Sequence, residues 1–179
     1  MEDIEIEFYS AGKNLLLILT GIGGTTKGFQ NKYEKIAKQV IQKYNFSVIV
    51  ATSPKGSWQH TKENLAYIMS VVNKKEFYNI FAMGSSAGAN ILLMHAYEFP
   101  KIKKILAINP ILNINLHKIN NGIELFNGKT ILICGEKDMS NKFIGIVNKK
   151  ANTITIPNAD HNFTNQLNDF IELYKYLFD

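Results

Sequence analysis

The chain has 179 residues, of which 46% are hydrophobic, and its formal net charge is +5. This length can bury one sizeable core but is too short for two ordinary domains, so we expect residues 1–179 to form a single domain. All 20 basic residues are lysines, scattered among 15 acidic residues. Because specific base contacts favour arginine, which is absent, we expect no nucleic-acid partner.

The sequence also lacks the features of membrane and secreted proteins. The first seven residues are acidic, and the apolar run at 15–19 is far too short to span a bilayer, so we expect no secretory signal and no membrane association. The single cysteine, Cys134, lies in an apolar run, which predicts a buried, unreactive thiol. This cysteine usage fits a reducing, cytoplasmic setting. Nothing in the sequence indicates an oligomeric state.

Seven segments predict β-strands. Near the start, Ile4, Ile6 and Phe8 alternate with polar residues, which is typical of a half-exposed antiparallel edge strand. Each of the next six segments is rich in branched apolar residues and predicts a buried strand of a parallel sheet. These segments are 15–19, 46–51, 78–83, 105–108, 130–134 and 153–156.

Helical patterns lie between the predicted strands. Apolar residues recur at steps of three and four in segments 33–44, 65–72 and 167–177, which gives each one apolar face. Segment 87–99 is apolar nearly all round and stops at Pro100, which predicts a central, buried helix. Strictly alternating strands and helices predict a three-layer α/β/α sandwich with a mostly parallel sheet of about six to seven strands. Its ligand site belongs at the carboxyl ends of the strands.

The sequence Gly84-Ser85-Ser86-Ala87-Gly88 joins a predicted strand to the predicted central helix. Its two glycines allow a sharp turn and a close approach of the backbone. The central serine, Ser86, would then project its hydroxyl from the carboxyl end of the strand, as a nucleophile does. We expect the neighbouring Ser85 to have a supporting or packing role.

Two further candidates follow later strands in the order that a catalytic triad requires. Asp138 lies in the turn after strand 130–134, and His161 lies in the loop after strand 153–156. A serine hydroxyl is a poor nucleophile until an imidazole takes its proton, and a carboxylate must orient that imidazole and stabilise its cation. The sequence therefore predicts that Ser86, His161 and Asp138 form a triad.

Several other residues remain as alternatives. Glu136 and Asp160 compete with Asp138 for the role of the acid, although Asp160 is adjacent to His161 in sequence and adjacent side chains usually point apart. Trp58 follows the strand at 46–51, where a wall of the acyl pocket and plain packing are equally good predictions.

The remaining histidines do not indicate a metal site. His95 falls inside the apolar helix, where a satisfied core or boundary residue is expected, and His60 and His117 have no paired ligands nearby. We therefore expect neither a metal nor a cofactor.

These motifs resemble those of the α/β-hydrolase family, in which Gly-x-Ser-x-Gly, a Gly-x-x-Asp turn and an Asp-His before the last helix carry the triad. The resemblance covers nearly the whole chain. It extends to Thr20-Gly21-Ile22-Gly23-Gly24, which is similar to the family's His-Gly-x-Gly-Gly oxyanion loop except that threonine replaces histidine. The resemblance implies that the backbone N–H groups of Ile22 and Ala87 stabilise the oxyanion.

The resemblance implies hydrolysis through an acyl-enzyme. Larger members of the family carry a lid after the strand that corresponds to 105–108, whereas residues 110–129 here leave room for little more than one short helix. We therefore expect an open site, minimal or no lid, and a small-molecule substrate with a short or medium ester. A thioesterase, a peptidase, an acyltransferase or a non-catalytic binding protein on the same fold remain alternatives.

Overall fold

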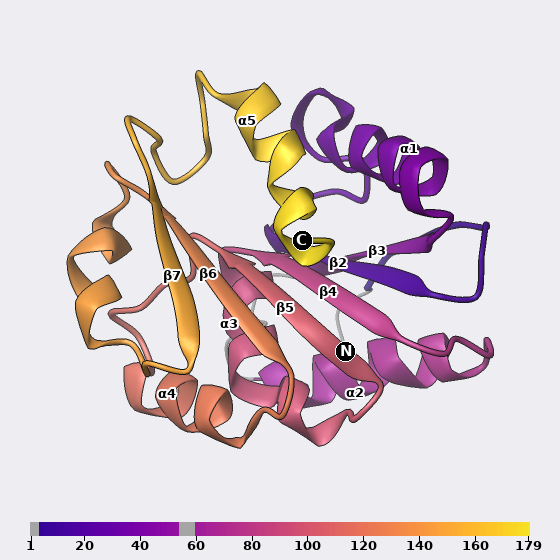
Figure 1. Ribbon diagram of the computed structural model, residues 1–179, viewed down its shortest axis with the longest axis horizontal. Helices are drawn as coiled ribbons and strands as arrows, with labels where there is room; N and C mark the ends of the chain where they lie inside the picture. The colour runs from indigo at the N-terminus through magenta and orange to yellow at the C-terminus, as the bar shows by residue number, and fades with distance from the viewer. Residues whose placement is uncertain (1–3, 54–59) are drawn as a thin grey trace.

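A twisted β-sheet forms the middle layer of the protein (Figure 1). The computed structural model describes residues 4–53 and 60–179, and within them seven strands form one sheet in the order β1-β3-β2-β4-β5-β6-β7. The strands are β1 (Ile6–Tyr9), β2 (Leu15–Ile22), β3 (Ser47–Ser53), β4 (Ile80–Ser85), β5 (Ile102–Ile108), β6 (Lys129–Gly135) and β7 (Ala151–Ile156).

The strand directions match the sequence patterns. β1 pairs antiparallel with β3 at one edge, as its alternating residues predicted, and all other neighbours are parallel. The inner strands have helices on both faces, which is why they read as continuous apolar runs instead of alternating ones. Parallel strands end on a common side, so the loops after them converge at the carboxyl end of the sheet.

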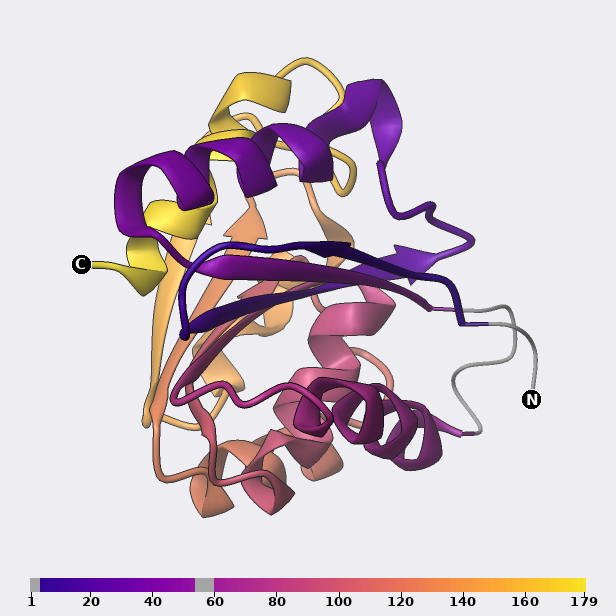
Figure 2. The same cartoon turned by 90° about the vertical axis from the view of Figure 1, so that its right-hand side faces the viewer.

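Helices cover both faces of the sheet (Figure 2). One face is covered by α1 (Lys32–Tyr44) and α5 (Leu167–Glu172), and the other by α2 (Thr61–Asn73), α3 (Ala87–His95) and α4 (Leu116–Leu125). The two interfaces make two separate apolar cores, so the predicted three-layer sandwich is confirmed. No helix in the described part of the chain is long and apolar enough to cross a membrane.

The predicted strict alternation of strand and α-helix is wrong between β6 and β7. A 3-10 helix over Met139–Ile146 makes this crossover. Only one of its residues is buried, so it lacks the apolar contacts that support most α-helices in proteins. The predicted helices at 87–99 and 167–177 also end in 3-10 turns, over Ala96–Glu98 and Leu173–Leu177.

The crossover from β5 to β6 contains α4 and no lid across its residues 109–128, all of which the structure describes. α4 packs against α3 on one face of the sheet instead of covering the carboxyl ends of the strands. Gly122 permits this packing, because a Cβ atom there would collide with the backbone oxygen of Leu93. The predicted short crossover with one short helix is confirmed.

Two glycines allow α3 to begin directly after β4. A Cβ atom at Gly84 would lie 2.6 Å from the backbone nitrogen of Ala89, and one at Gly88 would collide with the backbone oxygens of Leu19 and Thr20. The first turn of α3 therefore packs directly against the ends of β4 and β2. This close approach fixes the position of the residue between the two glycines, Ser86.

We predict that Gly88→Ala lowers the free energy of unfolding by about 2 kcal/mol, because the added methyl group forces backbone segments apart. This loss would occur even though alanine gains about 1 kcal/mol over glycine in a free helix. Gly145→Ala is the matched control, since a Cβ atom there meets nothing within 4 Å. Urea denaturation of both variants checks this, and equal stabilities would contradict the close-approach argument.

Candidate active site

Ser86 lies at the turn between β4 and α3 in a strained backbone conformation. Its φ of 53° and ψ of −115° lie outside the regions that residues with a Cβ atom normally adopt. Such strain costs on the order of 1–3 kcal/mol and is typical of functional sites. Two hydrogen bonds hold the turn: the N–H of Ser86 donates to the oxygen of Ile108 at 2.9 Å, and Asn90 N–H donates to the oxygen of Ser86 at 3.1 Å.

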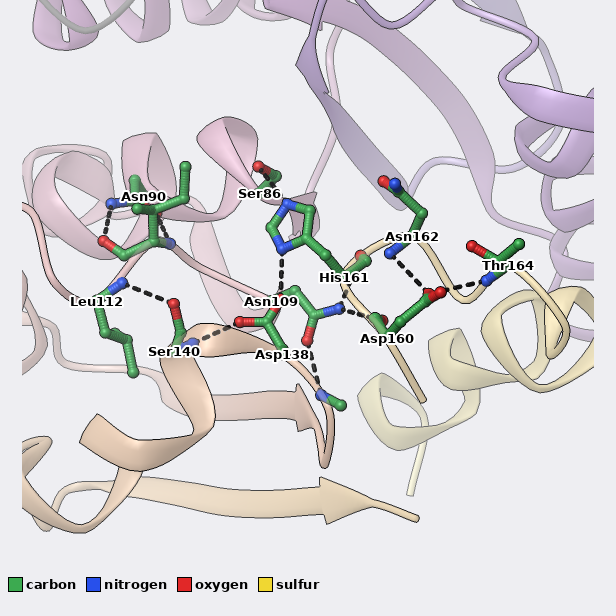
Figure 3. Close-up of polar contacts among 12 residues, drawn as sticks. Ser86, Asn90, Asn109, Leu112, Asp138, Ser140, Asp160, His161, Asn162 and Thr164 are labelled. Atoms are coloured by element: carbon green, nitrogen blue, oxygen red, sulfur yellow. Dashed lines mark hydrogen bonds and ion pairs between the residues drawn. The ribbon is translucent and has the colours of Figure 1, made fainter. Parts of the chain in front are cut away.

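The three residues of the predicted triad lie together in hydrogen-bonding order (Figure 3). Nε2 of His161 lies 3.0 Å from Oγ of Ser86, and Nδ1 of His161 is hydrogen-bonded to Oδ2 of Asp138. The Asp138 side chain is 2% exposed, whereas that of His161 is 41% exposed. The series therefore runs from a buried carboxylate to a histidine that a substrate can reach.

The environment of Asp138 keeps its carboxylate charged. Burial alone would raise the pKa of Asp138, but the hydrogen bond from His161 and the one from the backbone N–H of Ser140 at 2.6 Å together hold that pKa below its ordinary value. Asp138 is thus a negatively charged hydrogen-bond partner of His161 at neutral pH.

The two rival acids are engaged elsewhere. Oδ1 of Asp160 accepts hydrogen bonds from the backbone N–H groups of Asn162 at 3.1 Å and Thr164 at 2.9 Å. Oε2 of Glu136 accepts one from the N–H of Asn158 at 2.8 Å. Both carboxylates hold the loop that carries His161, and neither is hydrogen-bonded to the imidazole.

Asn109 is a structural residue of the site that sequence reasoning missed. Its buried side chain donates to the backbone oxygens of His161 at 2.8 Å and Asp160 at 3.2 Å, and it accepts from the N–H of Gly135 at 2.7 Å. It therefore joins the ends of β5 and β6 to the histidine loop (Figure 3). Its φ of 45° is left-handed, a conformation that asparagine tolerates well. The signal was an asparagine directly after a buried strand and before Pro110.

Two other missed residues hold the loop that follows β5. Asn90 accepts from the N–H of Ile111 at 2.7 Å and donates to the oxygen of the same residue at 3.1 Å. Oγ of Ser140 accepts from the N–H of Leu112 at 3.2 Å. An asparagine in the otherwise apolar helix was the available signal, because a buried amide needs specific partners.

The glycine loop after β2 lies against Ser86. A Cβ atom at Gly21 would be 3.4 Å from Cβ and 3.9 Å from Oγ of Ser86. The threonine that departs from the family's pattern bridges two strands: Thr20 Oγ1 accepts from the N–H of Ser53 at 3.2 Å, where the pairing of β2 with β3 shifts register. Thr20 therefore satisfies a backbone donor that the irregular ladder leaves unpaired.

The two predicted oxyanion donors border Ser86. Ile22 ends β2 and is 40% exposed in the cavity beside the serine. Ala87 is the first residue of α3, so its backbone N–H has no partner within the helix. Ile22 thus shares the cavity wall with Ser86, and Ala87 directly follows Ser86 in the chain. Their role as oxyanion donors stays a prediction.

A cavity of about 670 Å³ opens beside Ser86 and His161. Gly21, Phe29 and Lys32 line it, and Ser85 lines it as well, beside the triad serine. Trp58, which was a candidate for the wall of the acyl pocket, lies outside the described residues. Within the described residues, no group of three or more His, Cys, Asp or Glu side chains could hold a metal ion.

The other three histidines and the single cysteine lie outside the cavity wall. Nε2 of His95 lies 2.9 Å from Oγ1 of Thr61, and burial lowers the pKa of this histidine. His60 and His117 do not line the cavity. Burial raises the pKa of the Cys134 thiol to about 12, as the buried position of this residue predicted.

Several solved structures share this architecture. Est1E from Butyrivibrio proteoclasticus is similar over 98% of this chain and 92% of its own, with a TM-score of 0.76 at 12% sequence identity. An alpha-beta serine hydrolase homologue from Coxiella burnetii is similar over 97% and 91%, with a TM-score of 0.73 at 15% identity. The chain has the α/β-hydrolase fold.

A third structure bears on the lid. XC6422 from Xanthomonas campestris, described as an a/b serine hydrolase without lid, matches 97% of this chain and 86% of its own, with a TM-score of 0.67 at 15% identity. The α/β-hydrolase fold therefore also occurs without a lid. The β5–β6 crossover of this chain likewise contains no lid. The sequence itself matches no protein-family model and no curated protein.

We predict that Asn109→Ala lowers the free energy of unfolding by about 2–4 kcal/mol, because it leaves buried backbone groups without partners. Asn158→Ala is the matched control: Asn158 has the same left-handed backbone, with φ of 60°, but an exposed side chain. It should lose only about 1 kcal/mol. Chemical denaturation measures both, and equal losses would mean that the Asn109 hydrogen bonds contribute nothing.

Proposed function

We propose that the protein is a serine hydrolase that cleaves small or medium carboxylic esters through an acyl-enzyme. The hydrogen-bonded series from Ser86 through His161 to the buried Asp138, at the wall of an accessible cavity, is the observation that carries this proposal. Each member has the chemical property its role requires: a hydroxyl, an exposed imidazole and a charged carboxylate.

In the first step, Oγ of Ser86 attacks the carbonyl carbon of the ester while Nε2 of His161 takes the hydroxyl proton. Asp138 stabilises the imidazolium that forms. The carbonyl oxygen becomes an oxyanion, to which the backbone N–H groups of Ile22 and Ala87 donate hydrogen bonds. His161 then gives its proton to the departing alcohol, which leaves the acyl group on Ser86.

In the second step, water attacks the acyl-enzyme. His161 takes a proton from the water, and the same two backbone donors stabilise the second oxyanion. Collapse of this intermediate releases the carboxylic acid, and the proton returns to Ser86. No cofactor is needed, because water is the only second substrate.

The shape of the site supports a substrate of modest size. The crossover at residues 109–128 contributes Ile111 to the cavity wall but contains no lid, so a long acyl chain would stay largely in water and contribute little binding energy. The esterase domain from Rhodothermus marinus shares the fold at a TM-score of 0.67 and 10% identity, which makes an ester the first substrate to test. The same three residues would also serve thioester, amide or acyl-transfer chemistry.

We predict that the wild type hydrolyses p-nitrophenyl acetate and butyrate faster than p-nitrophenyl palmitate, and that Ser86→Ala abolishes this turnover. Circular dichroism of both proteins serves as the control for folding. A preference for palmitate would contradict the open-site argument. Turnover that persists in the variant would show that Ser86 is not the nucleophile, and failure of the wild type on all esters would favour another acyl donor or a binding role.

The assignment of the acid predicts an unequal effect of three amide substitutions. Asp138→Asn should lower kcat by about 10⁴-fold, because the amide stabilises the wrong tautomer of His161. Glu136→Gln and Asp160→Asn remove only loop hydrogen bonds and should each lower kcat by less than about tenfold. Steady-state kinetics on p-nitrophenyl butyrate measures all three. A larger loss in either control than in Asp138→Asn would overturn the assignment.

A further inference from the structure

A lysine lines the same cavity as Ser86. Lys32 is the first residue of α1, and the start of this helix lies on the side where the parallel strands end (Figure 2). Nζ of Lys32 lies 3.9 Å from the ring centroid of Phe170 and 5.1 Å from that of Tyr33. The ammonium group is therefore held against the aromatic rings by cation–π contacts, within a wall of the cavity.

No carboxylate of the described residues neutralises Lys32. Other lysines form ion pairs, as Lys62 does with Glu98 and Lys175 with Glu172, but Lys32 forms none with the described part of the chain. Burial lowers the pKa of the Lys32 ammonium to about 8, which is the sign of a desolvated charge without a compensating partner. An anion in the cavity would supply that partner.

The rest of the cavity wall offers nothing that competes for this role. Apart from Lys32, the described lining consists of glycines, apolar side chains, hydroxyl groups, Asn162 and the triad residue His161, with no acidic side chain. A single ammonium group matches one negative charge, and the chain has no arginine to bind a phosphate through two parallel hydrogen bonds. These facts favour a carboxylate over a phosphate.

We propose that the ester cleaved at Ser86 carries a free carboxylate, which binds the ammonium group of Lys32 while the ester carbonyl faces the serine. This inference rests on the proposed hydrolase function and names its substrate class. The reaction is unchanged: the acyl C–O bond breaks, water supplies the hydroxyl and the proton, and the second carboxylate takes no part in bond breaking.

Two pairs of esters test the proposal on either side of the scissile bond. Mono-p-nitrophenyl adipate and p-nitrophenyl hexanoate differ by a carboxylate on the acyl side. 4-Butyryloxybenzoate and its methyl ester differ by a carboxylate on the alcohol side. For each pair, the measured quantity is the ratio of kcat/KM for the anionic ester to that for the neutral ester, within one variant.

We expect Lys32→Met to lower this ratio about tenfold for at least one pair, as loss of a charge-assisted hydrogen bond predicts. Lys32→Arg should restore most of the ratio, because it keeps the charge. Lys27→Met is the matched control: it removes the same charge from the exposed loop before α1, outside the cavity wall, and should change the ratio by less than about twofold. Equal ratios in wild type, Lys32→Met and Lys27→Met for both pairs would overturn the proposal.

A binding measurement separates this inference from the hydrolase proposal. Calorimetric titration of 4-butyryloxybenzoate into Ser86→Ala and into Ser86→Ala/Lys32→Met reports the contribution of the lysine without turnover. We expect about tenfold weaker binding to the double variant. If neutral esters are turned over and Lys32→Met has no effect in either assay, the proposed carboxylate site is rejected and the hydrolase proposal is kept. A lack of turnover together with Lys32-dependent binding would reject the hydrolase and keep the anion site.

Discussion

Hydrogen bonds at the end of β5 hold the three segments that carry Ser86, Asp138 and His161. The oxygen of Ile108 accepts the hydrogen bond from the N–H of Ser86, and the next residue, Asn109, holds both the His161 loop and Gly135. The N–H of Asp138 in turn donates to the oxygen of Gly135 at 3.0 Å. A parallel sheet by itself places the loops after its strands on one side but does not fix their positions relative to one another. Here hydrogen bonds to Ile108 and Asn109 fix three such loops, which differ in length. Such placement is what a hydrogen-bonded series of catalytic groups requires.

Strain and close packing are concentrated at the same place. Ser86 is held in an unfavourable backbone conformation because Gly84 and Gly88 let α3 press against the ends of β4 and β2. On the other flank, Phe163 is buried with a φ of 55° and packs against Phe170, with 5.4 Å between the ring centroids. The apolar core thus offsets the local cost of both turns. The serine and the histidine loop are each tied to a rigid layer instead of resting on free surface loops.

The sequence predicted the sheet, its layers and the side chains that meet, because hydrophobic periodicity and strand-end positions report these features directly. It also placed Asp138 ahead of Asp160, whose carboxylate caps the backbone of its own loop. It could not predict Asn109 or Ser140, since their role depends on contacts between segments far apart in the chain. The same limit applies to Lys32, whose place in the cavity wall follows from how α1 packs against α5. The 3-10 crossover after β6 was missed because burial, and not the local pattern, decides whether a short helix forms.

The central claim is that Ser86 is a nucleophile activated by His161, and covalent labelling tests it most directly. The protein would be treated with a fluorophosphonate at neutral pH and analysed by intact mass and peptide mapping. The account predicts one adduct per chain, on Ser86, with labelling greatly slowed in His161→Ala. No adduct, an adduct on Ser85, or labelling of Ser86 at the same rate without the histidine would contradict it.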